Sequence, residues 1–556
     1  MFESIAQRRY LIPFKAARLT QQVTDVLVIG SGVAGLRAAI AAADEGAEVL
    51  VLTKDKAEES NTLYAQGGVA AALNPPDTVQ LHVQDTLHGG AGLCDPKAVE
   101  IVVREGAQRV LELLAWGARF DRNPANAHNL AFGLEGGHSH PRIVHADGDA
   151  TGREIELTLL RIAHSRDSIR VAEKAFVLDL ITEDGQCLGA IAMFEDRITL
   201  IWAKRTILAS GGAGMLYRET TNPRIATADG HAMAWRAGAT LQDMEMVQFH
   251  PTTLYVAGSS RALITEAIRG EGAQLLDRNG VRFMPEYHEM AELAPRDVVS
   301  RAIVEQIRKT SYTHVFMDLR HLKPEHLHAR FPRFAKLLEQ FDIDPAKDLV
   351  PIHPAAHYMM GGVDVDEQAR SSVPNLYAVG EASCTGLHGA NRLGSNSLLE
   401  GLAFGARAGI DAAREAKRNN VKFPLSLEYR VDPSTRTELD ITDVKSSLRS
   451  IMWRNVGIER TGEHLAETSE IISFWSRYVM DKVFGPSTLG RDGAASGWEV
   501  QNMLTVAAII TAAAYTRTES RGAHYRVDYP NRDDTHWRLH QLWRRPMSTP
   551  IPEPLG

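Results

Sequence analysis

A short apolar strand that runs into three closely spaced glycines constrains this chain more than any other sequence feature. Residues 25–29 are followed by Gly30-Ser31-Gly32-Val33-Ala34-Gly35, by a helical stretch of small residues at 35–45, and by a second apolar strand at 48–52. Strand, glycine turn, helix and strand in this order, within about 30 residues, are typical of a βαβ unit and a parallel sheet. The sequence therefore predicts an α/β fold.

The glycine motif predicts a Rossmann-like dinucleotide-binding loop rather than a purely structural turn. The first glycine permits a tight turn, the second lets a pyrophosphate approach the backbone, and the third packs the helix on the strand. The acid expected at the end of the second strand is absent, because Thr53 and Lys54 stand there. A ribose contact must then come from a hydroxyl or backbone group, or Lys54 lies against a phosphate. This weakens NAD as the ligand and leaves FAD open.

Length, charge and cysteine content exclude several classes of protein. The 556 residues predict three or four domains at about 150 residues each. The net charge of −8 lacks the global basic footprint of a nucleic-acid-binding protein. The three cysteines lie far apart in the sequence, so we expect a reducing, cytoplasmic location and neither a disulfide framework nor an iron–sulfur cluster on this chain. No uncharged apolar run approaches the roughly 18 residues of a membrane span.

The order of elements along the chain indicates one sheet that is interrupted by an insertion. Strands that run into glycine recur at 205–210 and 375–379, whereas charged helices and a stretch rich in His, Lys and Arg occupy the region between 254 and 354. Amphipathic patterns at 440–467, 471–482 and 498–517 predict a helical C-terminal domain. The first 22 residues lack the apolar core of a secretory signal, so we expect an extension packed on the body.

Histidines and arginines at the edges of the insertion suggest a site for a small diacid. His250, His353 and His357 stand there, and Arg269, Arg296 and Arg392 lie in polar contexts. Arginine binds carboxylates bidentately, which suits a dicarboxylate. His138, His140 and His145 lack a cysteine or acid at metal-ligand spacing, so we expect a hydrogen-bonding loop and no metal there. The polar loop 60–68 is open to two interpretations, a flexible connection or a set of backbone donors around a flavin ring.

Several motifs, taken in order, resemble the flavoprotein family of succinate dehydrogenase, fumarate reductase and L-aspartate oxidase. The resemblance runs from about residue 24 to residue 465. It rests on the Gly30 loop, 60–68, 209–214, Asp229-Gly230, Phe249-His250-Pro251-Thr252, 265–272, Pro295-Arg296-Asp297, 356–362, Gly380-Glu381-Ala382-Ser383 and Asn396-Ser397-Leu398-Leu399.

This resemblance implies a fold class and a domain order. The expected fold is α/β, with a Rossmann-like FAD-binding domain, an inserted α+β capping domain that closes over a dicarboxylate, and a C-terminal helical domain. The expected boundaries are 1–243 and 359–424 for the two parts of the FAD-binding domain, 244–358 for the capping domain, and 425–556 for the helical domain with its tail.

Three local features favour the aspartate-oxidising branch of the family. Asn61 stands where membrane-complex members carry a histidine bonded to the flavin, so the resemblance implies noncovalent FAD. The loop Glu135-Gly136-Gly137-His138-Ser139-His140 is similar to one whose glutamate faces a substrate ammonium, and the segment from Gly394 to Gly401 is similar to the oxidase version. The implied reaction is FAD-dependent oxidation of L-aspartate to iminoaspartate, the first step of quinolinate and NAD biosynthesis, with electrons passed to oxygen or fumarate. The alternative is a fumarate reductase or succinate dehydrogenase flavoprotein subunit.

The resemblance also implies roles for individual residues. Arg296 is the expected proton-exchanging residue and Glu135 the ammonium partner, while His250, Thr265, His357 and Arg392 are the expected carboxylate ligands. The implied FAD contacts are Gly30, Ser31, Gly32, Val33, Ala34, Gly35, Lys54, Asn61, Thr62, Leu63, Tyr64, Ala65, Gln66, Gly67, Gly68, Asp229, Glu381, Ser397 and Leu398. For Glu381 the alternative is an ordinary loop acid, and for Asn396-Ser397 it is a helix N-cap that also aims the helix dipole at the flavin.

The implied partners are small molecules and one enzyme. They are L-aspartate, fumarate and oxygen, with quinolinate synthase as a downstream partner. A flavin-dependent nucleic-acid-modifying protein could share the glycine loop, but the mild acidity and the set of histidines and arginines argue against nucleic acid.

Overall fold

A mixed seven-stranded sheet forms the centre of the molecule. The computed structural model describes residues 2–257, 261–418, 423–424, 426–432, 434–546 and 549–555. The sheet strands are β2 (Thr20–Ile29), β3 (Val49–Leu52), β9 (Ile169–Ala172), β10 (Phe176–Glu183), β11 (Gln186–Phe194), β12 (Arg197–Leu208) and β19 (Leu376–Ala378). Their order is β10-β11-β12-β2-β3-β9, with β19 paired to β12. β2, β3, β9, β12 and β19 run parallel, whereas β11 is antiparallel to its two neighbours, β10 and β12.

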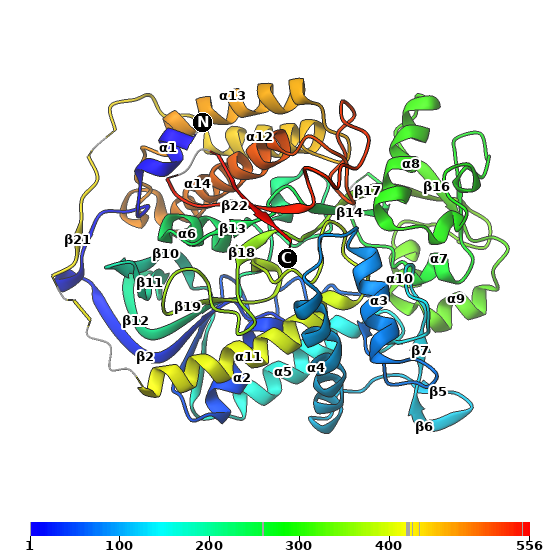
Figure 1. Cartoon of the computed structure of the whole chain (residues 1–556), viewed down its shortest axis with the longest axis horizontal. Helices are drawn as coiled ribbons and strands as arrows, with labels where there is room; N and C mark the ends of the chain where they lie inside the picture. Colours follow the sequence, from blue (N-terminus) through cyan, green and yellow to red (C-terminus); the bar gives the residue numbers. More distant parts are fainter. Residues whose placement is uncertain are drawn as a thin grey trace.

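Both faces of this sheet are covered, which explains why its strands are apolar throughout. Val26 and Val28 point to one face, where α2 (Val33–Asp44), α4 (Pro96–Ala115), α5 (Thr151–His164) and α11 (Asn396–Arg418) pack. Leu27 and Ile29 point to the other face and join the core formed with α6 (Asp229–Ala237) and the C-terminal helices. Figure 1 shows α2 and α11 lying together beneath β2 and β12.

The turn after β2 brings two strands and a helix unusually close together. Gly30 has a φ of 113°, and a Cβ on it would overlap the carbonyl oxygen of Ala209, which follows β12. A Cβ on Gly35 would in turn overlap the carbonyl oxygen of Gly30. The first and third glycines of the motif are therefore required by close backbone approach, and the φ of Gly30 and the packing at Gly35 agree with the tight turn and the helix–strand contact that the sequence predicts.

A four-stranded antiparallel sheet lies to one side of the molecule, at the right of Figure 1. Its order is β14-β17-β16-β15, from β14 (Val247–Leu254), β15 (Gln274–Leu276), β16 (Val315–Asp318) and β17 (Val350–Met359). Its helices are α7 (Ala267–Gly270), α8 (Arg296–Lys309), α9 (Pro324–Arg330) and α10 (Pro332–Glu339). This segment has a hydrophobic core of its own.

The C-terminal helices pack against the central body as α12 (Ile441–Asn455), α13 (Gly462–Val479) and α14 (Pro486–Thr516). The expectation of one helix over 440–467 is wrong, because the chain leaves the helical conformation at Val456 and a new helix begins after the N-cap Thr461. The helix expected at 498–517 begins earlier, at Pro486, and is interrupted at Gly490, which has a φ of 68°.

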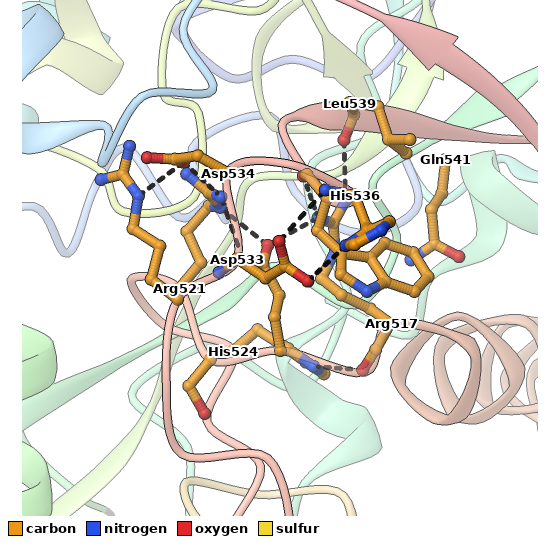
Figure 2. Close-up of polar contacts among 12 residues, drawn as sticks. Arg517, Arg521, His524, Asp533, Asp534, His536, Leu539 and Gln541 are labelled. Atoms are coloured by element: carbon orange, nitrogen blue, oxygen red, sulfur yellow. Dashed lines mark hydrogen bonds and ion pairs between the residues drawn. The ribbon is translucent and has the colours of Figure 1, made fainter.

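The tail that follows α14 is anchored by buried charges and ends in two strands. β22 (Leu539–Trp543) pairs with β13 (Leu241–Gln242) and β23 (Ile551–Pro554), in a sheet completed by β18 (Gly362–Asp364) and β20 (Ser383–Cys384). In Figure 2 Arg517 donates to the carbonyl oxygen of Leu539 at 3.0 Å, and Arg521 pairs with Asp534 at 2.8 Å. Part of the expected helical domain is thus β structure.

The N-terminal extension packs on the body, as expected. Ile5 and Leu11 are fully buried, and the backbone N–H of Leu11 donates to the Asp179 carboxylate at 2.7 Å. Part of this segment is a strand, since β2 already begins at Thr20. In the described part of the chain, no helix is long and apolar enough to cross a membrane.

The remaining elements are short, apart from helix α3, which contacts the loops of the candidate site. They are α1 (Phe2–Gln7), β1 (Phe14–Lys15), β4 (Val69–Ala70), α3 (Val79–Gly89), β5 (Arg122–Asn123), β6 (Asn126–Leu130), β7 (Phe132–Gly133), β8 (Ile143–Val144) and β21 (Glu428–Tyr429). The predicted fold class is confirmed by this architecture. The domain boundaries stay a prediction, and position 425 lies outside the described residues.

The glycine turn yields a stability prediction. Gly30→Ala combines a left-handed backbone conformation with steric overlap, so we expect it to lower the free energy of unfolding by about 2–5 kcal/mol. Gly185→Ala is the matched control, because Gly185 has a φ of 75° and no atom within 4 Å of the added Cβ. It should cost only about 1–2 kcal/mol. Denaturant unfolding of both variants measures the difference, and equal losses would contradict the overlap.

Candidate active site

A cavity of about 760 Å³ lies where the carboxyl ends of the parallel strands face the four-stranded sheet. Every site residue that the family resemblance implies lines this cavity, except Gly35 and Leu63, whereas two of the candidates for a diacid site, Arg269 and His353, do not line it. Gly35 lies inside α2 against Gly30, and Leu63 donates its backbone N–H to the Ser60 hydroxyl. The structure therefore brings residues from distant parts of the chain to one place.

One end of the cavity is formed by the glycine turn and the loop that crosses it. The backbone N–H of Val33, at the start of α2, donates to the Thr62 hydroxyl at 3.0 Å. The Ser31 hydroxyl donates to the carbonyl oxygen of Ala57 at 2.8 Å and lies 2.9 Å from the Thr53 hydroxyl. Thr53, which replaces the acid of many dinucleotide sites, thus contacts the turn itself.

Lys54 and Asp229 form a partly buried ion pair beside this turn. The Lys54 Nζ lies 2.8 Å from Asp229 and 2.7 Å from Glu499, and the other Asp229 oxygen accepts from the Asn502 amide at 2.7 Å. Lys54 therefore lines the cavity with its charge already neutralised by protein carboxylates. This arrangement connects the cavity wall to α14.

Glu381 lies at the end of the strand-to-glycine segment 375–380. One carboxylate oxygen accepts from the Asn61 amide at 2.8 Å and the other from the backbone N–H of Met359 at 2.9 Å. Burial raises the pKa of Glu381 to about 7, and these two hydrogen bonds oppose that rise. The group therefore titrates near neutral pH in the absence of a ligand.

The opposite end of the cavity is rich in buried guanidinium groups. The Arg296 Nε donates to Glu266 at 2.6 Å, and Arg269 pairs with the other oxygen of Glu266 at 3.2 Å. Arg296 and Arg392 both donate to the Gln248 side-chain oxygen, at 3.1 Å each. Arg296 and Arg392, which line the cavity, are thus fixed in place by protein acceptors, whereas Arg269 stands behind them.

Two histidines line the same end. The His250 and His357 rings lie edge to face with centroids 5.1 Å apart, and His357 Nδ1 lies 2.8 Å from the Thr221 hydroxyl. Burial lowers the pKa of both imidazoles well below the usual value, with Arg296 and Arg392 acting in the same direction. Both rings are therefore neutral hydrogen-bonding groups at neutral pH.

Glu135 is the carboxylate that faces these groups from the loop between β7 and β8. It is only 4% exposed and accepts from the Ser395 hydroxyl at 2.7 Å. Burial raises the pKa of Glu135, and the nearby Glu266 raises it further. No group of three or more His, Cys, Asp or Glu in the described ranges could hold a metal ion.

Three residues that hold site side chains in place, Gln248, Glu266 and Ser395, were not predicted from the sequence. Gln248 has a signal in the sequence, since it stands two residues before His250 on β14 and so shares its face of the strand. Glu266 follows Thr265 and stands three residues before its partner Arg269. Ser395 has a φ of 60°, a conformation that its sequence does not reveal.

Comparison with known proteins agrees with this architecture. Two family models match, FAD binding domain over residues 25–398 and Fumarate reductase flavoprotein C-term over residues 445–551. L-aspartate oxidase of Streptomyces coelicolor is 43% identical over 533 residues, covering 94% of this chain and 91% of that protein. L-aspartate oxidase of Vibrio cholerae is 40% identical, covering 91% and 96%.

Solved structures of related flavoproteins share the fold. A variant of E. coli quinol fumarate reductase matches with a TM-score of 0.90 at 32% identity, covering 97% of both chains. The Mycobacterium smegmatis Sdh1 complex in the apo form matches with a TM-score of 0.83 at 31% identity, covering 97% of this chain and 95% of that one.

The fold and the cavity define an FAD-binding flavoprotein of the type that includes the fumarate reductase flavoproteins. Within this class, the identities of 40–43% over nearly the whole length place the chain in the L-aspartate oxidase family. FAD is the cofactor of this family, and the predicted resemblance is confirmed.

The residues at the sheet end of the cavity fit FAD. Gly30 and Gly32 leave the backbone open where a pyrophosphate would approach the N-terminus of α2. The Asn61 Oδ1, Gln66 Oε1 and Ser210 Oγ atoms are buried in the cavity wall and have no hydrogen-bond partner among the described residues. Buried polar atoms without partners are costly, so a polar ligand explains them.

Glu381 yields a prediction for FAD binding. A ribose hydroxyl that donates to the carboxylate favours its charged form, so binding releases a proton and affinity should rise as the pH rises through about 7. Fluorescence titration of the apoprotein with FAD at pH 6 and pH 8 should show this rise, and Glu381→Gln should flatten it. Asp364→Asn is the control, because burial raises the pKa of Asp364 to about 6 away from the cavity lining. An unchanged pH dependence in Glu381→Gln would contradict the assignment.

Proposed function

We propose that this chain uses FAD to oxidise L-aspartate to iminoaspartate. The observation that carries the proposal is the placement of the buried Glu135 carboxylate in the cavity that Arg296, Arg392 and the neutral His250 and His357 also line. The reaction removes a hydride from Cα and a proton from the nitrogen, which leaves a carbon–nitrogen double bond. The curated relatives named L-aspartate oxidase support the same activity.

Charge balance at the substrate end supports an amino diacid. Arg269, Arg296 and Arg392 are cationic, and Glu266 is an anion whose pKa the two nearest arginines hold below its usual range despite burial. With Glu135 ionised the group carries one net positive charge, which matches L-aspartate with its two carboxylates and one ammonium. With Glu135 protonated it carries one more positive charge, which matches a dicarboxylate without an amine.

The substrate carboxylates would be held by the groups that face the cavity. Arg296 and Arg392 provide charged donors, and His250, His357 and Thr265 add neutral ones. Anchoring at both ends of a short diacid fixes the orientation of the carbon between them. Segment 244–358, proposed as a capping domain on the FAD-binding parts 1–243 and 359–424, would exclude water when closed. Segment 425–556 completes the proposed domain order.

The amine must lose its proton before or while the hydride leaves. Glu135 would receive the ammonium on its carboxylate, and its raised pKa makes it a better proton acceptor than an ordinary carboxylate. When the reaction runs on fumarate, Arg296 would supply the proton to the substrate carbon. FAD, when bound, supplies the two-electron chemistry.

The proposal extends to the electron acceptor, the use of the product and the location of the protein. Reduced cofactor would pass its electrons to oxygen or to fumarate. The product would feed quinolinate formation in NAD biosynthesis, with quinolinate synthase as the partner downstream. A cytoplasmic location belongs to the proposal, supported by three buried, unpaired cysteines.

The experiment that tests the proposed function is an anaerobic substrate panel with the FAD-loaded protein. We expect L-aspartate to bleach the flavin absorbance, and D-aspartate and succinate to leave it unchanged. Bleaching by succinate but not by L-aspartate would favour the alternative, a fumarate reductase or succinate dehydrogenase flavoprotein subunit. This alternative is tested because the fold matches that of E. coli quinol fumarate reductase with a TM-score of 0.90.

Glu135→Gln should separate the two reactions. The ammonium loses its charged partner, so kcat/KM for L-aspartate should fall about ten- to a hundredfold, while fumarate reduction should change about threefold or less. In the unmodified protein kcat/KM for L-aspartate should rise with pH through the raised pKa of Glu135, and fumarate affinity should fall. Both pH dependences should disappear in the variant. Equal losses in both reactions would contradict the role.

Asn61 predicts a noncovalent cofactor. An asparagine amide lacks the nucleophilic nitrogen that would bond to a flavin, so acid precipitation of the holoprotein should leave all yellow colour in the supernatant. Colour that stays with the pellet would contradict this prediction.

A further inference from the structure

The Glu135 carboxylate rests against an unusual piece of backbone. Its hydroxyl donor, Ser395, has a φ of 60°, and a Cβ on the preceding Gly394 would come within 2.7 Å of Glu135 and 3.0 Å of Arg296. A left-handed serine costs about 1–2 kcal/mol unless its surroundings hold it. The position of Glu135 therefore depends on whatever holds residues 394 and 395.

The His138 imidazole contacts the backbone of Gly394. Its Nε2 lies 3.0 Å from the Gly394 carbonyl oxygen, and its Nδ1 lies 3.1 Å from Arg142 Nη1. A guanidinium can only donate, so Nδ1 accepts and the ring proton is on Nε2, where it donates to Gly394. Burial lowers the pKa of His138 to about 4, with Arg142 acting in the same direction, so the ring stays neutral.

Arg142 is itself immobilised by two carboxylates. Its Nε and Nη2 donate to the two oxygens of Asp77 at 2.9 and 2.8 Å, and its Nη1 donates to Asp85 at 2.5 Å. The Arg142 side chain is fully buried, and Asp77 is almost so. Asp85 also accepts from the backbone N–H and hydroxyl of Ser139, which fixes the far end of the Glu135 loop.

Helix α3 holds the other side of the same backbone. His82 Nε2 lies 2.8 Å from the Asn396 side-chain oxygen, and Thr86 accepts from the Asn396 amide at 3.0 Å. The Glu135 loop, the 394–396 turn and α3 thus form a closed ring of contacts. His138, Arg142, Asp77 and Asp85 do not line the cavity, so they touch neither substrate nor cofactor directly.

We propose that His138 is a positioning residue for Glu135, and that the contacts from Asp77 and Asp85 through Arg142 and His138 to Gly394 set the preference for substrates that bear an ammonium group. Loss of the Gly394 contact releases Ser395 and the wall behind Glu135. Arg296 stays held by Glu266 and Gln248, so binding of a dicarboxylate without an amine is preserved. This inference rests on the proposed function.

Two similar substitutions at position 138 test the inference. His138→Asn keeps an acceptor for Arg142 but is too short to donate to Gly394, whereas His138→Gln reaches the position of Nε2 and keeps that donor. We expect kcat/KM for L-aspartate to fall about tenfold or more in His138→Asn, with fumarate reduction within about threefold of normal. His138→Gln should restore L-aspartate oxidation to within about threefold.

The controls separate this role from general stability. His140→Asn makes the same change in the same loop without touching Gly394 and should leave both reactions unchanged. Equal losses of both reactions in His138→Asn, no loss at all, or no rescue by glutamine would overturn the inference. If His138→Asn fails to fold, Asp85→Asn decides, since it weakens the hold on Arg142: a selective loss with L-aspartate supports the inference and its absence overturns it.

The activity of the wild-type protein distinguishes a failure of the proposed function from a failure of the inference about His138. If it does not oxidise L-aspartate, the proposed function fails and the inference falls with it. If it does so while His138→Asn keeps normal selectivity, only the inference fails.

Discussion

A carboxylate buried between two guanidiniums, Glu266 between Arg269 and Arg296, is the interaction on which the site depends. Burial of an unpaired guanidinium costs several kcal/mol, so neither arginine could stay in the interior without this anion. Arg296 is the first residue of α8, and Glu266 directly precedes α7. One ion pair therefore joins two elements of the inserted segment and sets the directions of the donors that face the cavity.

The local parts of the structure could be predicted from the sequence. The Gly30 turn, its two strands and α2 are determined by neighbours within about 30 residues, and the glycines there have a steric reason that a pattern reveals. The resemblance to a family then supplied a predicted domain order and predicted contacts, most of which line the cavity. Both come from short motifs in which residue type and spacing are read together.

The parts that escaped prediction depend on distant pairs. Gln248 accepts a hydrogen bond from Arg392, which is 144 residues later, and Ser395 donates one to Glu135, which is 260 residues earlier. Periodicity along one segment carries no information about such partners. The break between α12 and α13 was not predicted, for a related reason. The amphipathic pattern continues across the break, whereas the buried Arg460 guanidinium within it contacts His524 Nδ1 at 2.7 Å.

The pairing of β22 with β13 has a consequence for the order in which the protein is made. Gln242 and Leu542, which are partners in this sheet, are separated by 300 residues. The sheet that joins β13, β18 and β20 to the tail is complete only when β22 and β23 have left the ribosome. Most of the chain, including the whole cavity lining, is synthesised before this closing strand exists. The nascent protein therefore exposes an open sheet edge until β22 has been synthesised, which is the period in which association with other chains is hardest to avoid.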